Sequence, residues 1–256
     1  SKRSNREYNM NVLLWLAYKG TNYAGFQVQP NAPTVCSTLQ DAMQAVLGCR
    51  PDVKGCSRTD AGVHARRFAL NFHYDGKVPL RQLPLAFNAY LPPDIRVLEA
   101  LPVPEDFHAR YAAHAKTYAY RIRSGAVDDP FDSDFTYRVA APLDLAAMQR
   151  AAAGFVGTHD FLALCASGSS VAARGDTVRT VSACTVTAAD GVCTLTVTAD
   201  GYLYNMVRIL AGTVLQAGRG KLDPAAVPAI LQSRDRSRAC PPLPACGLCL
   251  LRVDYD

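Results

Sequence analysis

An aspartate set among arginines is the feature of this sequence best suited to chemistry. Asp60 follows Arg58 closely, and Arg66 and Arg67 come a few residues later. Guanidinium groups keep a neighbouring carboxylate ionised, and they also bind phosphates. Gly62 permits backbone angles that other residues resist, which favours a turn. These residues fit a nucleophile or base presented to a nucleic acid, and they equally fit an Asx-type turn with a solvated salt bridge.

The residue patterns on either side place Asp60 in the fold. Residues 68–74 alternate between apolar and polar side chains, which is the pattern of a half-buried strand, and residues 53–56 predict a shorter strand. Asp60 is therefore expected on a loop between two strands, a place where functional residues are often found.

Several segments resemble those of one enzyme family. Residues 58–65, Arg-Thr-Asp-Ala-Gly-Val-His-Ala, resemble the active-site motif of the TruA-type tRNA pseudouridine synthases, in which the aspartate is catalytic. Other segments resemble this family in the same order along the chain: residues 23–29, 106–111, 116–120, 205–208, 241–242 and 247–248. The likeness runs from about residue 12 to residue 253, which is almost the whole chain.

The resemblance implies a role for five residues. Asp60 would be the catalytic residue, either as a nucleophile on the anomeric carbon or as a base at the neighbouring ribose carbon. Arg58 would stabilise the flipped-out RNA, or act as a general phosphate clamp. Tyr118 matches the tyrosine that packs on the target base, although the strand pattern alone fits core packing equally. Arg208, in an apolar helical stretch, would pair with Asp60 if the halves meet, or else snorkel to solvent. Leu248 would line the pocket, although strand leucines usually belong to the core.

The periodicity of apolar residues predicts an α+β fold built from two β-α-β-β-α-β halves of the RNP or ferredoxin-like kind. Residues 1–104 would form the half that carries the catalytic aspartate loop, and residues 105–256 would form the half that completes the cleft. The resemblance adds that the halves join into a mainly antiparallel sheet, with helices on one side and a central basic cleft. The predicted strands are residues 11–18, 53–56, 68–74, 95–101, 118–123, 178–188, 192–198 and 248–253, and the predicted helices are 34–47, 80–91, 144–155, 205–217 and one that opens at 223.

Composition and charge agree with a folded protein that binds a polyanion. Apolar residues make up 49% of the 256 residues and charged residues 19%, and the net charge is +5. No apolar run is long enough to span a bilayer, and no signal peptide is visible, so we expect a cytoplasmic protein. The basic residues that predict an RNA-binding cleft are Arg58, Arg66, Arg67, Arg110, Lys116, Arg121 and Arg123. Asp128, Asp129, Asp132 and Asp134 predict an acidic loop kept away from the nucleic acid.

Cysteines and histidines give weaker signals. The nine cysteines have no export signal beside them, so free thiols are expected. Cys246 and Cys249 have a spacing used for zinc or redox chemistry, but no second pair lies at zinc-finger spacing. Cys184 and Cys193 flank a predicted hairpin turn that keeps them too far apart to bridge. His64, beside Asp60, fits either a solvated loop position or an acid–base role.

The resemblance implies a cytoplasmic isomerase that converts uridine to pseudouridine at positions 38 to 40, in the anticodon arm of tRNA. The reaction neither adds nor removes atoms, so we expect no metal and no nucleotide cofactor. The resemblance also implies a homodimer, which agrees with the limited surface that one chain offers to a whole tRNA. The alternatives are a catalytically silent RNA-binding protein on the same scaffold, and a zinc- or thiol-dependent enzyme that uses Cys246 and Cys249.

Overall fold

A computed structural model describes residues 9–256 and divides the chain into two compact units. Of the described residues, unit 1 contains 9–113 together with Tyr255–Asp256, and unit 2 contains His114–Asp254. The division therefore falls later than the predicted boundary after residue 104. The reason lies in the segment 103–113, whose backbone is bound to the strands of unit 1.

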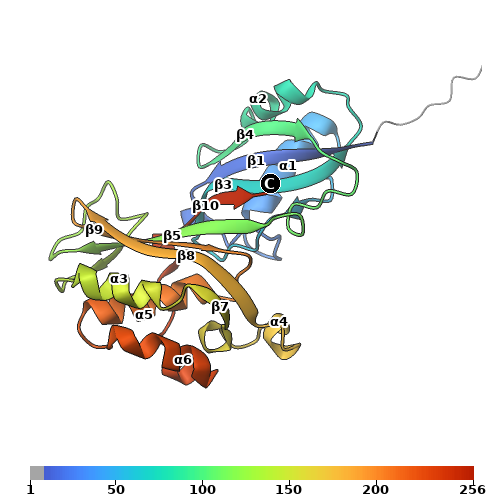
Figure 1. The fold of residues 1–256 in the computed structure, drawn as a ribbon. Helices are drawn as coiled ribbons and strands as arrows, with labels where there is room; N and C mark the ends of the chain where they lie inside the picture. Colours follow the sequence, from blue (N-terminus) through green and yellow to red (C-terminus); the bar gives the residue numbers. More distant parts are fainter. Residues whose placement is uncertain (1–8) are drawn as a thin grey trace, which may run out of the picture. The chain divides into compact units, whose positions relative to one another are not determined.

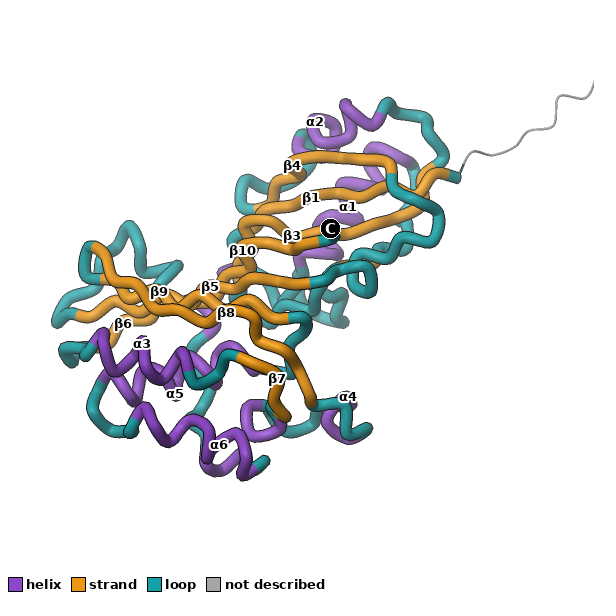
Figure 2. The backbone as a smooth tube through the Cα atoms, in the orientation of Figure 1, coloured by secondary structure: helices purple, strands orange, loops and turns teal. Residues whose placement is uncertain are grey.

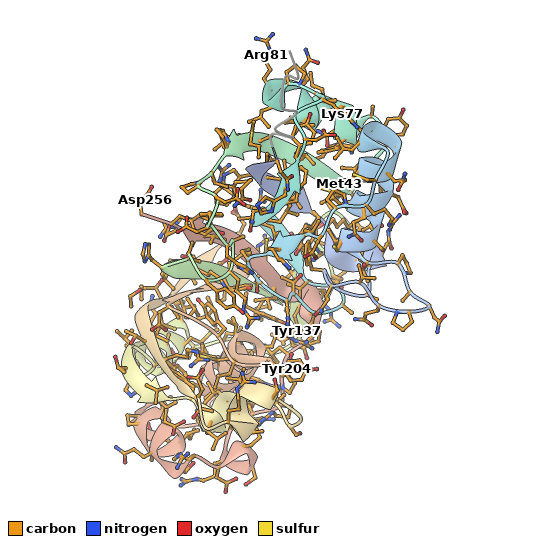
Figure 3. All side chains as sticks on the ribbon, turned by 90° about the vertical axis from the view of Figure 1, so that its right-hand side faces the viewer. Met43, Lys77, Arg81, Tyr137, Tyr204 and Asp256 are labelled. Carbon is orange, nitrogen blue, oxygen red and sulfur yellow. The ribbon has the colours of Figure 1, made fainter. Side chains whose placement is uncertain are left out.

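Unit 1 has the predicted β-α-β-β-α-β order. Its strands are β1 (Met10–Tyr18), β2 (Lys54–Gly55), β3 (His64–Tyr74) and β4 (Ile95–Pro102), and its helices are α1 (Val35–Leu47) and α2 (Leu83–Asn88). The strand order is β4-β1-β3, with β2 pairing with β3, and every pair is antiparallel (Figure 1). Thr34, the first residue of the predicted helix 34–47, caps α1 in a capping box with Ser37. The apolar side of α1, including the fully buried Met43 labelled in Figure 3, belongs to the core.

Two buried asparagines attach the segment after β4 to unit 1. The Asn11 amide donates to the carbonyl oxygens of Pro104 at 2.9 Å and of Phe107 at 3.0 Å. The Asn71 amide oxygen accepts from the Ala109 N–H at 2.8 Å, and the Tyr255 hydroxyl donates to the Ala109 carbonyl at 2.6 Å. The Tyr255 ring also packs against Trp15 and Phe107, with centroid distances of 5.9 and 5.1 Å. These contacts explain why unit 1 extends to Ala113.

Unit 2 contains more strands than the sequence predicts. Its strands are β5 (Ala115–Ser124), β6 (Tyr137–Val139), β7 (Gly157–Asp160), β8 (Val178–Ala189), β9 (Val192–Ala199) and β10 (Leu248–Asp254). They run in the order β10-β5-β9-β8-β7, all antiparallel, and β6 pairs in parallel with β5. The helices are α3 (Leu145–Ala153), α4 (Ser170–Ala173), α5 (Met206–Gly218) and α6 (Val227–Ser233). Figure 2 shows α3, α5 and α6 on one side of these strands.

Local turns account for much of this agreement between sequence and structure. Asp190 and Gly191 both have positive φ, at 51° and 76°, as a tight two-residue hairpin turn requires. The predicted separation of the two cysteines is confirmed, since Cys193 lies opposite Ala188 and Cys184 lies opposite Val197. Short 3₁₀ helices complete the chain: Gly20–Asn22, Leu80–Gln82, Leu162–Leu164, Pro224–Ala226, Arg236–Arg238 and Ala245–Gly247.

The expected α+β class is confirmed, because each unit combines mostly antiparallel strands with packed helices. None of the helices between residues 9 and 256 has the length and apolarity that a membrane span requires.

Candidate active site

Asp60 lies on the predicted loop between β2 and β3, at the start of a tight turn. Its carbonyl oxygen accepts a hydrogen bond from the Val63 N–H at 3.1 Å. Gly62, at the third position of this turn, has a φ of 82°, which is the position where such a turn needs glycine. Asp60 is half-buried and Arg58 is exposed. The hydrogen bond and the positive φ of Gly62 thus define the turn, and the turn fixes the backbone position of the residue that carries the carboxylate.

A second segment, residues 23–26, binds the loop on both sides of Asp60. The Phe26 N–H donates to the Thr59 carbonyl at 3.1 Å, and the Gly62 N–H donates to the Tyr23 carbonyl at 3.3 Å. The Thr59 hydroxyl also lies 2.7 Å from the hydroxyl of Tyr18 in β1. The backbone before and after Asp60 is thus attached to neighbouring segments, and such attachment favours the exact placement that catalysis requires.

Two glycines let these backbones approach each other. Gly25 has a φ of 89°, and a Cβ atom there would lie 2.7 Å from the Thr59 carbonyl oxygen. A Cβ atom at Gly20 would lie 2.0 Å from the Val63 carbonyl oxygen. Sequence reasoning assigned neither glycine a role, and only Gly25 had a signal, because it lies in the segment 23–29 that matches the family's early motif. Phe26 completes the support, because its ring packs on Phe68 with a centroid distance of 4.3 Å.

His64 is a positioning residue for this loop. It opens β3 and is buried, with 3% of its surface exposed, so the solvated loop position expected for it is wrong. Its Nδ1 atom accepts a hydrogen bond from the buried Gly20 N–H at 2.9 Å. The accepting nitrogen carries no proton, and the ring therefore ties the 3₁₀ helix that begins at Gly20 to the end of the Asp60 loop.

We expect His64→Phe to lower the free energy of unfolding by about 1–3 kcal/mol, because the Gly20 N–H loses its acceptor inside the protein. His64→Gln, whose amide oxygen can accept the same bond, should recover part of that loss. Urea unfolding measures both changes, and the pH dependence of kcat/KM should keep its shape. A variant of unchanged stability that loses one limb of the pH profile would instead show an acid–base role.

In unit 2, Tyr118 and Leu248 share one face of neighbouring strands. Tyr118 lies on β5 and Leu248 on β10, where Leu248 is paired with Tyr120 and Leu250 with Tyr118. Tyr118 is 6% exposed, and its ring meets that of Tyr202 edge-on at a centroid distance of 4.9 Å. The structure thus places the ring in packed surroundings, and a contact with Tyr202 fixes its orientation.

Arg208 lies in the first turn of α5 and is anchored there. Its Nε atom donates to the Leu243 carbonyl at 2.7 Å, and its Nη1 atom donates to the Asn205 side-chain oxygen at 3.2 Å. Gly212 lets the segment with Leu243 cross close to α5, because a Cβ atom there would lie 2.6 Å from the Pro241 carbonyl. The family-like residues 241–242 therefore belong to the segment that holds Arg208 in place.

Several predicted RNA-binding arginines are already paired. Arg67 contacts Glu99 at 3.2 Å, and its guanidinium lies 4.2 Å from the centre of the Trp15 ring. Arg121 and Arg123 both bind Asp132, each with a shortest distance of 2.7 Å. By contrast, no acidic side chain among residues 9–256 lies within ion-pair distance of Arg58 or Arg66, both of which are exposed. The acidic segment thus neutralises part of the basic strand β5, which sequence reasoning did not anticipate.

Asp132 makes the structure sensitive to acid. Burial opposes ionisation of its carboxyl group, but hydrogen bonds from Arg123 and Arg121 outweigh that effect and lower its pKa below the usual value. A lowered pKa in the folded state stabilises the fold fully above about pH 4, and this stabilisation is lost as the pH falls through the lowered pKa.

We expect Asp132→Asn to lower the free energy of unfolding at neutral pH by about 1–3 kcal/mol and to flatten its decline in acid. Asp128→Asn is the matched control, because this exposed aspartate of the same segment has no arginine within ion-pair distance among the described residues. Urea unfolding at several pH values measures both. Equal acid dependence in the wild type and the Asp132 variant would contradict the pairing.

The surroundings of Cys246 do not favour a reactive thiol. The Cys246 thiol donates to the Thr136 carbonyl at 3.4 Å, and burial raises its pKa. A raised pKa lowers the thiolate fraction and hence the reactivity of the thiol. Within residues 9–256, no group of three or more His, Cys, Asp or Glu side chains could hold a metal ion.

Comparisons with known proteins identify the class of this chain. A family model described as tRNA pseudouridine synthase matches residues 15–112 and 151–256. A tRNA pseudouridine synthase A from Moorella thermoacetica is 46% identical over 94% of this chain and 97% of its own length. Proteins of the same name from Caldicellulosiruptor saccharolyticus and Halalkalibacterium halodurans are 40% and 42% identical, over 96% and 92% of this chain and 99% and 89% of their own lengths.

The chain belongs to the tRNA pseudouridine synthase family. This membership confirms the family suggested by the motif around Asp60, and it confirms the expected enzyme class, an isomerase.

Proposed function

We propose that this chain converts uridine to pseudouridine at positions 38 to 40 of the tRNA anticodon arm, with Asp60 as the catalytic residue. The observation that carries the proposal is the family motif on a loop whose backbone is hydrogen-bonded on both sides of Asp60. The carboxylate would either attack the anomeric carbon of the target uridine or remove a proton from the neighbouring ribose carbon. Each route needs a carboxylate held at a fixed point, which the turn and its supports supply.

Four further residues would bind the substrate. Arg58 is exposed on the Asp60 loop. Its side chain would bind a phosphate or fill the space that the target base leaves when it flips out of the RNA. Tyr118 would pack on the target base, and its contact with Tyr202 holds the ring in one orientation. Arg208 would contact the substrate, and its hydrogen bonds to Leu243 and Asn205 would hold it in place at the start of α5. Leu248 would offer apolar surface to the base. No metal ion or nucleotide cofactor is assigned to this chemistry.

We also propose that the enzyme is a cytoplasmic homodimer. One chain offers limited surface for a whole tRNA, and a second copy would enlarge the surface available to remote phosphates. Light scattering coupled to size-exclusion chromatography tests this proposal, and a mass of one chain at micromolar concentration would contradict it.

The substrate can be tested by chemical mapping of pseudouridine in unmodified tRNA. We expect product at positions 38 to 40, and little change in rate when the flanking bases are swapped with pairing preserved, because structured RNA is recognised mainly by shape and backbone. An isolated anticodon stem-loop should be a poor substrate, since it lacks the remote phosphates. Product found only in the T arm, or no product in tRNA at all, would refute the positions or the activity respectively.

A further inference from the structure

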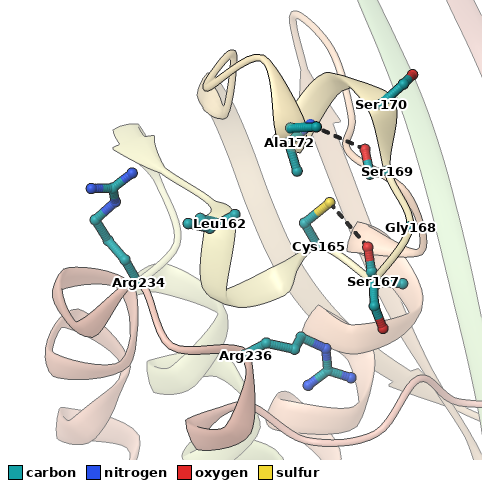
Figure 4. A pocket seen from close by; sticks show the side chains of 11 residues that line it. Leu162, Cys165, Ser167, Gly168, Ser169, Ser170, Ala172, Arg234 and Arg236 are labelled. Atoms are coloured by element: carbon teal, nitrogen blue, oxygen red, sulfur yellow. Dashed lines mark hydrogen bonds between the residues drawn. The ribbon is translucent and has the colours of Figure 1, made fainter.

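A pocket in unit 2 combines apolar walls with two arginines and contains none of the five proposed site residues. Its volume is about 670 Å³, within the range of pockets that bind small organic groups. Leu162, Cys165, Ala166 and Ala172 supply apolar surface, and Arg234 and Arg236 supply the charge. Figure 4 shows these arginines on one side of the pocket and the serine-rich segment 167–170 on the other.

The arginines are fixed but keep donors for a ligand. The Nε atom of Arg234 contacts the Asp160 carboxylate at 2.8 Å, and Nη1 of Arg236 donates to the Ala239 carbonyl at 3.2 Å. Asp160 is itself held by the Thr177 hydroxyl at 2.7 Å. A guanidinium has five N–H donors, so each side chain retains several after these contacts.

The polar groups on the facing segment also suit an anion. Ser167, Ser169 and Ser170 carry hydroxyl groups, and Gly168 adopts a φ of 83° between them. The Ser169 oxygen accepts from the Ala172 N–H at 3.2 Å, so its hydroxyl hydrogen can donate elsewhere. Among the lining residues, all within the described part of the chain, none is acidic. Asp160 offsets the charge of Arg234, but among the described residues no acidic side chain lies within ion-pair distance of Arg236, so the pocket keeps a positive charge that favours an anionic ligand.

We propose that this pocket binds one unstacked ribonucleotide of the tRNA other than the target uridine. The apolar walls suit a base, and Arg234, Arg236 and the serine hydroxyls suit its phosphate, as in binding sites for single-stranded RNA. A bare phosphate would leave the apolar walls unused, and an uncharged apolar ligand would leave the arginines unused. The inference rests on tRNA being the substrate and does not depend on which uridine is modified.

The test measures tRNA affinity with purified full-length variants. Arg236→Ala should raise the Kd for a tRNA transcript about 3- to 10-fold. It should also reduce the slope of log Kd against log salt concentration by about 1, which is the change expected for the loss of one phosphate contact. Arg238→Ala is the matched control, because it removes the same charge from an exposed residue of the same 3₁₀ helix that does not line the pocket. The control should change the Kd by less than about twofold. Equal effects of the two variants would overturn the proposal, since they would show only general surface charge.

A second variant tests the base. Ala172→Leu fills the apolar side without changing charge, so it should raise the Kd at least about fivefold and leave the salt slope unchanged. Thermal unfolding confirms that the variant folds. An unchanged Kd in a folded Ala172 variant would overturn the proposal that a base enters the pocket. Failure of the proposed modification at positions 38 to 40 would be seen separately, by product mapping with the unaltered chain.

Discussion

Asp60→Asn is expected to lower the rate of pseudouridine formation at least about a thousandfold, while tRNA affinity stays within a few-fold of the original. Asparagine keeps the size of the side chain but cannot attack a carbon or accept the proton. Binding depends mostly on phosphate contacts, which the substitution does not remove. Single-turnover assays with saturating enzyme measure the rate, and filter binding measures the affinity.

Asp52→Asn provides the matched control for Asp60. Asp52 is an exposed aspartate shortly before β2 that pairs with Lys54. Its loss removes the same charge from the neighbourhood and should leave the rate nearly unchanged. Substantial turnover by the Asp60 variant would show that another group performs the chemistry.

Gly25→Ala is expected to reduce the rate about a hundredfold, although Gly25 is not itself a catalytic residue. The new Cβ atom would lie 2.7 Å from the Thr59 carbonyl oxygen, so the residue before Asp60 must move. A displacement of about 1 Å at a reacting group can cost about a hundredfold in rate. The positive φ of Gly25 adds about 1–3 kcal/mol of backbone strain, which urea unfolding will show as lost stability.

Gly48→Ala separates the two effects of that substitution. Gly48 ends α1 with a φ of 77°, and a Cβ atom there meets nothing within 4 Å. The Gly48→Ala variant should therefore lose about 1–2 kcal/mol of stability and keep the original rate of pseudouridine formation. If Gly48→Ala and Gly25→Ala reduce the rate equally, the contact between Gly25 and the Asp60 loop does not control catalysis.

Local patterns in the sequence were sufficient for most of the elements that position the site. Thr34 marks the start of α1, Asp190 and Gly191 fix the hairpin register, and the flanks of Asp60 predict its loop. Each of these depends on residues within a few positions of one another. Strands β6 and β7 and helix α4 were not predicted, because three or four residues are too few to show a period.

Contacts between residues that are not neighbours in the sequence could not be predicted from local patterns. Asp132 belongs to an acidic segment whose pattern predicts a solvated loop. No pattern in the residues around it predicts that it pairs with Arg121 and Arg123. His64 likewise lies close to Asp60 in the sequence, yet its ring accepts a hydrogen bond from the Gly20 N–H. Such pairings depend on which segments the folded chain brings together, and charge or proximity along the chain does not determine them.

The place of Tyr255 in unit 1 bears on how the chain is synthesised. Trp15 and Ala109 emerge from the ribosome early, whereas Tyr255, which packs on one and bonds to the other, follows the whole of unit 2. At usual elongation rates the delay is on the order of ten seconds. Until Tyr255 is added, unit 1 lacks both the ring that packs on Trp15 and the hydroxyl that donates to the Ala109 carbonyl, so its final packing must follow the synthesis of unit 2.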